Sequence, residues 1–276
     1  MTQAFQASGV ITLTTDFGLH DPFVAVMKAS IVKRFATARI IDVTHDIRAH
    51  SPAEAGFWLA RSLDYFPDGT VHVAVVDPGV GTARELLAAR VRSHLLLAPD
   101  NGLLAPVLAR EPEAQVIRIA QTELWRLGIT HVSATFHGRD IFAPIAAELA
   151  AGRCALDALG TRTATWVPSD IGEPEARAHS VAGCIVAIDH FGNLISNIDA
   201  RLIARFQRPR AHLGARTFEL RRTYGEVRSG EYLALVNSFE VVEIARVGCS
   251  AAEGLGLSQG TPIVVSDGAL EARSEG

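Results

Sequence analysis

The chain has 276 residues, 48% of them hydrophobic and 20% charged, with a formal net charge of −4 and a mean hydropathy of +0.20. Such a chain can bury a large core and form one large or two medium-sized domains, while its acidic balance argues against nucleic acid as a partner. Three scattered cysteines, the lack of a signal sequence and the lack of a membrane-spanning window together predict a cytoplasmic protein that contacts no membrane.

Two of the strands predicted in the first half of the chain end at an aspartate. The apolar run at residues 10–14 is followed by Asp16, and the valine-rich run at residues 73–76 is followed by Asp77. A proline and a glycine come directly after Asp77 and force a sharp turn there. Ligands bind at the carboxyl ends of strands in open α/β sheets, so both acids are candidate site residues. The simpler alternative for Asp77 is a tight turn with a solvated acid.

Helical patterns alternate with these strands. Asp21 stands directly before a proline, which is typical of a helix start, so we predict a helix from there to about residue 35. Asp21 is then either the cap of this helix or a ligand. A strand at residues 39–43 follows, and a serine-proline pair opens a second helix with apolar positions at helical spacing up to residue 63.

Two histidine-containing segments are further candidate sites. His45, Asp46 and His50 share a loop, but their spacing fits no standard zinc pattern. His137 lies in the polar run Thr-Phe-His-Gly-Arg-Asp, which leads into an apolar helical pattern at residues 141–150. A histidine and a glycine before a helix could hold water or an anion, or His137 could be structural.

The rest of the first half predicts a short hairpin and further small elements. We expect paired strands at residues 85–92 and 95–98, a short helix at 103–109 and a strand at 116–119. The alternation of strands and helices indicates an α/β fold.

Two domains are predicted from a change in composition. Residues 1–168 form an N-terminal α/β domain with a central, mostly parallel sheet, and residues 169–178 form a linker that contains proline and acids. Residues 179–276 form a smaller all-β, barrel-like domain, since short apolar segments there alternate with glycine turns. Its predicted strands lie at residues 181–189, 194–198, 211–213, 217–221, 232–236, 241–245 and 262–265.

An ordered set of motifs resembles the S-adenosyl-L-methionine (SAM) hydroxide adenosyltransferase family, also called adenosine-forming SAM hydrolases, which are relatives of fluorinase and chlorinase. The motifs stand at residues 16–21, 75–84, 98–103, 135–140, 188–197 and 237–245. The resemblance implies an α/β domain, a C-terminal β-barrel and a homotrimer with active sites between subunits. It also implies hydrolysis of SAM, which is the substrate, to adenosine and L-methionine without a cofactor or metal.

The resemblance assigns roles to individual residues. Its Asp, Arg and His set falls on Asp77, Arg84 and His137, and its ribose-binding aspartate falls on Asp16. Further implied contacts with the sugar, methionine or adenine fall on Asp21, His50, Asp189, Phe191, Asn193, Ser238, Phe239 and the segment from Arg246 to Gly248.

The chemistry of the reaction agrees with this set. Water is a poor nucleophile and a sulfonium is an excellent leaving group, so the enzyme must position water and remove a proton from it. Asp77 or His137 is the expected base, and Arg84 would keep Asp77 ionised. The backbone amide of Gly138 could donate a hydrogen bond to the attacking oxygen.

Three other functions would use some of the same residues. A SAM-dependent halogenase is disfavoured because Asp77 would repel a halide and the span from Thr82 to Pro99 is short. A non-catalytic SAM or adenosine sensor would not need a water-activating set. A metal-dependent phosphoesterase would use Asp16, His45, Asp77 and His137 as ligands but leaves the motifs of the second domain unexplained.

Overall fold

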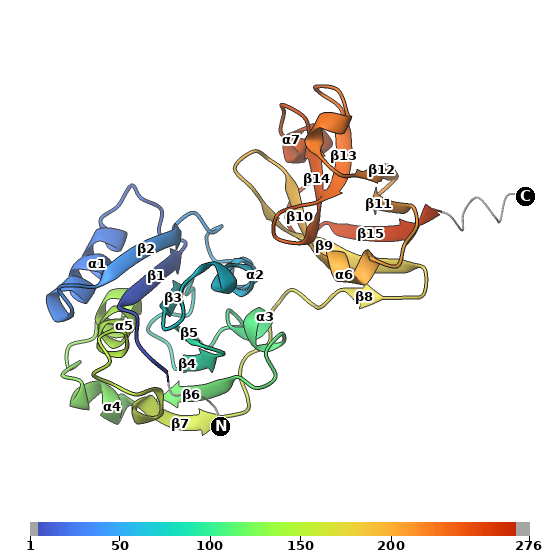
Figure 1. Cartoon of the computed structure of the whole chain (residues 1–276). Helices are drawn as coiled ribbons and strands as arrows, with labels where there is room; N and C mark the ends of the chain where they lie inside the picture. Colours follow the sequence, from blue (N-terminus) through green and yellow to red (C-terminus); the bar gives the residue numbers. More distant parts are fainter. Residues whose placement is uncertain (1–4, 269–276) are drawn as a thin grey trace, which may run out of the picture. The chain divides into compact units, whose positions relative to one another are not determined.

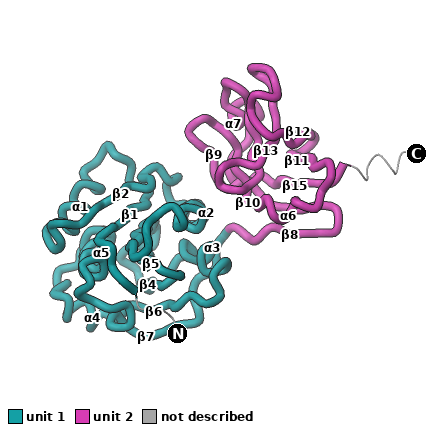
Figure 2. The backbone as a smooth tube through the Cα atoms, in the orientation of Figure 1, with its two compact units in different colours: residues 1–170 teal, residues 171–276 magenta. Residues whose placement is uncertain are grey.

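The computed structural model describes residues 5–268 of the chain. These residues fall into two compact units, divided between Asp170 and Ile171, which Figure 2 shows in different colours. The segment expected to be a linker, residues 169–178, contains a short strand, β8 (Glu175–Ala176), which pairs with the first long strand of the second unit.

The first unit is built on one seven-stranded sheet (Figure 1). The strands lie in the order β2-β1-β3-β5-β4-β6-β7, with parallel pairing from β2 to β5 and antiparallel pairing from β5 to β7. Five of the seven strands therefore point the same way, which confirms the predicted α/β class. The strands are β1 (Val10–Thr15), β2 (Arg39–Thr44), β3 (Val71–Val75), β4 (Leu86–Val91), β5 (His94–Pro99), β6 (Gln115–Ile119) and β7 (Gly160–Thr163).

Both faces of this sheet are covered by helices. Val73 and Val75 pack into one apolar cluster with the helices α1 (Phe23–Arg34) and α5 (Ala143–Ala150), while Ala74 packs into a second cluster with α2 (Pro52–Ser62) and α3 (Ala105–Leu108). Successive side chains of a strand point to opposite faces, so a continuous apolar run is what a strand buried on both sides requires. Among residues 5–268, no helix combines the length and the apolar character needed to cross a membrane.

Some helix boundaries differ from the sequence-based expectation. The prediction of Asp21 as a helix cap is wrong, since α1 begins at Phe23, Pro22 occupies the cap position and no side chain caps the helix. The helix after His137 starts with a π-helical turn, η2 (Gly138–Phe142), before α5. Short elements that were not predicted are α4 (Gln121–Arg126) and the 3₁₀ turns η1 (Leu63–Tyr65) and η3 (Leu156–Leu159).

The second unit is a closed β-barrel of seven strands. Each strand pairs with the next in the order β9-β10-β14-β13-β12-β11-β15, and β15 pairs with β9 to close the ring. The predicted barrel-like domain is confirmed. The strands are β9 (Ser180–Ile188), β10 (Leu194–Asp199), β11 (Pro209–Leu213), β12 (Arg216–Arg221), β13 (Tyr232–Val236), β14 (Val241–Arg246) and β15 (Pro262–Asp267), and short helical turns are α6 (Ala200–Ile203), η4 (Tyr224–Glu226) and α7 (Ala251–Leu255).

Candidate active site

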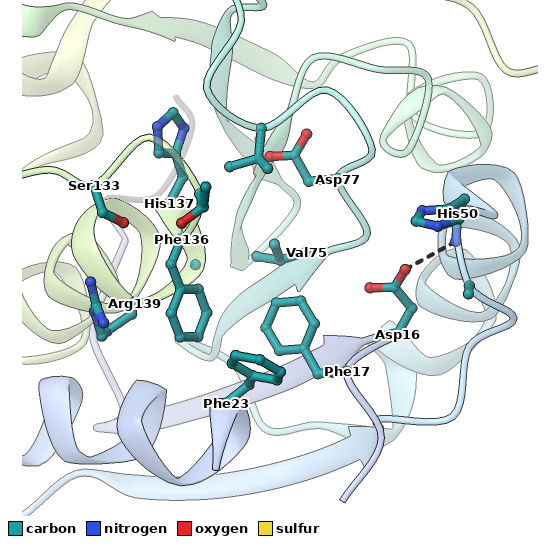
Figure 3. A pocket seen from close by; sticks show the side chains of 14 residues that line it. Asp16, Phe17, Phe23, His50, Val75, Asp77, Ser133, Phe136, His137 and Arg139 are labelled. Carbon is teal, nitrogen blue, oxygen red and sulfur yellow. Dashed lines mark hydrogen bonds between the residues drawn. The ribbon is translucent and has the colours of Figure 1, made fainter. Parts of the chain in front are cut away.

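A cavity of about 740 Å³ opens at the carboxyl ends of β1 and β3 in the first unit (Figure 3). Its wall is formed by the turns after these two strands, the start of α1, the loop before α2 and the segment that precedes α5. In Figure 3, Asp77 lies across the cavity from Phe23, and Asp16 lies beside His50 at a third side. The lining residues are Asp16, Phe17, Phe23, Ala49, His50, Val75, Asp77, Val80, Ser133, Thr135, Phe136, His137, Gly138 and Arg139.

Arg84 connects the two titratable groups on one wall of this cavity. Its Nε donates a hydrogen bond to Asp77 Oδ1 at 2.8 Å, its Nη2 donates to Asp77 Oδ2, and Nη2 also lies 2.9 Å from His137 Nδ1. The side chains of Arg84 and Asp77 are only 8% and 4% exposed. The structure thus brings together the three residues that the sequence placed 7 and 53 positions apart.

This contact fixes the proton on the histidine ring. A guanidinium can only donate, so His137 Nδ1 accepts from Arg84 and the proton of the neutral ring lies on Nε2. Burial and the charge of Arg84 lower the pKa of His137, and they outweigh the opposing effect of Asp77 and Asp140. His137 is therefore a neutral hydrogen-bond donor near neutral pH.

The turn between Asp77 and Arg84 is built to pack closely on the segment that carries His137. The amides of Val80 and Thr82 donate to the carbonyls of Asp77 and Gly79, at 3.2 Å each. Gly81 has a φ of 78°, and a Cβ at this position would lie 2.1 Å from the carbonyl oxygen of Ala134. Only glycine combines this backbone angle with such a close approach, and this is how the two loops meet.

Asp16 is held by the loop before α2. The backbone amide of His50 donates to Asp16 Oδ2 at 3.0 Å, as the dashed line in Figure 3 shows. His50 has a φ of 63°, in the left-handed region that non-glycine residues rarely adopt. Strained backbone of this kind persists where the surroundings enforce it, and it is common at ligand sites.

Three phenylalanines form an apolar wall that the sequence analysis missed. The rings of Phe17, Phe23 and Phe136 contact one another edge to face, with centroids 5.5 to 6.1 Å apart. The guanidinium of Arg139 lies 5.0 Å from the Phe136 ring centroid. Each of these phenylalanines lies within two positions of a predicted site residue, and this proximity was the available signal.

Asp21 does not line the cavity. Its side chain is 58% exposed, and its Oδ1 lies 3.6 Å from His20 Nδ1.

The predicted residues of the second unit lie in three local structures. Asp189 and Phe191 line a cavity of about 580 Å³, and Phe191 is 74% exposed. Asp189 Oδ1 accepts hydrogen bonds from the amides of Phe191 and Asn193 at 2.9 and 2.8 Å, and Oδ2 accepts from Asn193 Nδ2 at 2.9 Å. The aspartate thus shapes the turn that presents Phe191 to the solvent.

The other residues of this set lie outside that cavity. Ser238 is exposed, and the amide of Phe239 donates to Asn237 Oδ1 at 2.9 Å. Arg246 Nε donates to the carbonyl of Gly230 at 3.0 Å. Gly248 is exposed and has a φ of 72°.

The residues of the metal-dependent alternative do not form a cluster. Within the described chain, no group of three or more His, Cys, Asp or Glu side chains has an arrangement that could hold a metal ion. His45 is buried, with Nδ1 at 2.8 Å from Thr15 Oγ1, and both carboxylate oxygens of Asp77 are bonded to Arg84.

Comparison with known proteins identifies both units. The family model of the SAM hydroxide adenosyltransferase N-terminal domain matches residues 11–160, and that of the C-terminal domain matches residues 183–264.

Individual relatives match over most of the chain. A protein named (R)-S-adenosyl-L-methionine hydrolase from Salinispora tropica is 38% identical, covering 94% of this chain and 98% of that protein. One of the same name from Thermus thermophilus is 36% identical, covering 90% and 96%. A crystal structure of an uncharacterized conserved protein from Thermotoga maritima superimposes with a TM-score of 0.83 at 33% identity, covering 93% and 99%. A fluorinase from Nocardia brasiliensis is only 26% identical, covering 68% and 71%.

Proposed function

The chain belongs to the SAM hydroxide adenosyltransferase family, and we propose that Asp77, Arg84 and His137 prepare the water molecule that its reaction consumes. The protein is an enzyme that hydrolyses SAM to adenosine and L-methionine. The observation that carries the residue assignment is the pair of contacts from Arg84 to Asp77 and His137 at the wall of the cavity.

The reaction needs one bond to form and one to break. The water oxygen attacks the 5′-carbon of the ribose, the bond from this carbon to sulfur breaks, and the electron pair stays on sulfur, which becomes a neutral thioether. The water gives up one proton. A positive charge disappears from the reacting centre, so an apolar wall such as that of Phe17, Phe23 and Phe136 favours the transition state.

Each residue of the set has a separate role in this proposal. Asp77 is the base, because a carboxylate accepts a proton and because the neutral His137 has its proton on Nε2 and donates. His137 Nε2 and the amide of Gly138 orient the attacking oxygen. Arg84 touches neither water nor substrate; it holds the carboxylate of Asp77 in place and His137 in one tautomer.

Substrate binding is assigned to both units. The carboxylate of Asp16, beside His50, accepts hydrogen bonds from the ribose hydroxyls. Asp21 contacts the sugar or the methionine part of SAM. The second unit contributes Asp189, Phe191, Asn193, Ser238, Phe239, Arg246 and Gly248 to adenine and methionine. We propose that these contacts are completed between subunits of a homotrimer. Light scattering tests this proposal, because it should give the mass of three chains.

The proposal includes no metal and no cofactor, since the water-activating groups are side chains. We also propose a cytoplasmic location. Cys154, Cys184 and Cys249 are all free thiols, as expected in a reducing compartment.

The activity is tested by incubating the purified protein with SAM in H₂¹⁸O and separating the products. Adenosine that carries the label at its 5′-oxygen, together with unlabelled methionine, is expected, also in the presence of a chelator. A 5′-halogenated adenosine formed with added chloride would instead identify a halogenase. Bound but unchanged SAM would identify a sensor.

A further inference from the structure

We propose that His45 is a positioning residue that fixes Asp16 in the orientation needed to hold the ribose. The proposal rests on the assignment of the ribose hydroxyls to Asp16. His45 follows β2, its side chain is 2% exposed and it does not line the cavity, so it acts through other residues.

His45 is the buried centre of a network of polar contacts that reaches the surface at Asp42 and Lys28. Its Nδ1 lies 2.8 Å from Thr15 Oγ1, and its Nε2 lies 3.1 Å from Asp42 Oδ1, although Nε2 has no well-aligned hydrogen bond within the described residues. Lys28 Nζ in turn donates to Asp42 Oδ2 at 2.6 Å. Burial raises the pKa of Asp42, but the hydrogen bond from Lys28 and the proximity of His45 outweigh this effect, so the net pKa is lowered and the carboxylate is ionised.

The contacts of His45 define which atom donates and which accepts in each hydrogen bond of this network. The ionised Asp42 favours the ring proton on His45 Nε2, so Nδ1 accepts from the hydroxyl of Thr15. The same hydroxyl oxygen accepts the backbone amide of Phe17 at 3.2 Å. Thr15 and Phe17 flank Asp16, so these hydrogen bonds fix the backbone on both sides of Asp16.

The backbone of the His45 loop adds three bonds to the same turn. The carbonyl of His45 accepts from the amide of Gly18 at 2.8 Å, and the amide of Ile47 donates to the carbonyl of Thr15 at 3.3 Å. The amide of His50 then donates to Asp16 Oδ2 at 3.0 Å. One loop thus holds the turn from residue 15 to 18 at four points, and His45 supplies two of them.

This arrangement has a catalytic consequence. Asp16 keeps its carboxylate in place through the amide of His50, whose left-handed φ of 63° is unfavourable outside glycine. A strained backbone needs rigid support from its surroundings. A substrate-binding side chain that is displaced by about 1 Å loses much of its effect on the reaction rate. His45 gives this support from a buried position outside the cavity lining.

The test compares two variants at the same position. His45→Asn keeps an acceptor near the place of Nδ1, while His45→Gln keeps a polar group only near the place of Nε2. Thr15→Val and Thr15→Ser probe the same bond from the other end. For each variant, kcat/KM is measured with SAM and with its 2′-deoxy and 3′-deoxy analogues, and the ratio of the values is compared. This ratio does not depend on how much of the protein is folded.

We expect the wild type to prefer SAM, and we expect Asp16→Asn, His45→Gln and Thr15→Val each to lose roughly tenfold or more of that preference. His45→Asn and Thr15→Ser should retain most of it. The double variant Asp16→Asn/His45→Gln should discriminate no less than Asp16→Asn alone.

Other outcomes would refute the role of His45 and the ribose assignment of Asp16 separately. If Asp16→Asn loses the preference while His45→Gln keeps it, the role of His45 is refuted and the ribose assignment stands. If His45→Asn loses as much as His45→Gln, the bond through Nδ1 is not the support. If the wild type does not discriminate, the ribose assignment fails and the inference fails with it.

Discussion

Replacing Arg84 by methionine separates the structural from the chemical role of its contacts. The change removes two hydrogen bonds to Asp77 and one contact with His137, and it leaves a carboxylate that is 4% exposed without its partner. Breaking a buried ion pair from one side costs about 3–5 kcal/mol of unfolding free energy. Loss of one preorganised electrostatic element lowers turnover roughly 10²- to 10³-fold.

The double variant Asp77→Asn/Arg84→Met provides the decisive comparison. It contains no unpaired buried charge at this position. Its unfolding free energy should therefore be higher than that of Arg84→Met and close to that of the wild type. Its turnover should not recover, because neither the base nor the group that orients His137 is present. Arg84→Lys is the matched control that keeps the charge but not the planar fork.

Two assays are needed for this comparison. Urea denaturation gives the unfolding free energy, and single-turnover product formation at saturating SAM gives the chemical step. If turnover in Asp77→Asn/Arg84→Met returns together with stability, the ion pair serves only the fold. The assignment of water activation to this set would then be refuted.

Two histidines and the Gly81 turn of the first unit allow three further tests. The kcat/KM of the wild type should fall in acid with an apparent pKa below the usual 6.5, because burial and Arg84 lower the pKa of His137. In Arg84→Met this acid limb should move to higher pH. An acid limb above 6.5 in the wild type would contradict the neutral state assigned to His137. Burial lowers the pKa of His72 to about 3, so between pH 6.5 and 3 the unfolded chain binds a proton that the folded chain does not. The unfolding free energy should therefore decline by roughly 4–5 kcal/mol as the pH falls through this window, and urea titrations of His72→Gln should show a flatter dependence. Gly81→Ala should lower both stability and turnover, since its Cβ would meet the carbonyl of Ala134; unchanged circular dichroism melting and turnover would disprove this close approach.

The sheet and barrel were predictable from sequence because their signals are local. Residues 73–76 are apolar without interruption, and the structure shows why, since alternate side chains enter two different cores. The short helices α4 and α7 were not predicted. With 6 and 5 residues they have almost no helical period, and tertiary packing decides their conformation.

The site was predictable only in part. Asp77 and Arg84 are joined by a local proline-glycine turn, but His137 reaches them across 53 residues, and the family resemblance rather than periodicity connected it to them. The wall of Phe17, Phe23 and Phe136 was missed because its members are scattered along the chain and each fits an ordinary core position. The tautomer of His137 depends on an interatomic contact that no sequence pattern encodes.

The central claim is that Asp77 takes the proton from the attacking water. The most direct measurement is the single-turnover rate of Asp77→Asn at saturating SAM, with SAM affinity from calorimetry and with the exposed Asp64→Asn as control. The account predicts a loss of roughly 10²-fold or more in rate, with little change in affinity and none in the control. A rate equal to that of the wild type would contradict it.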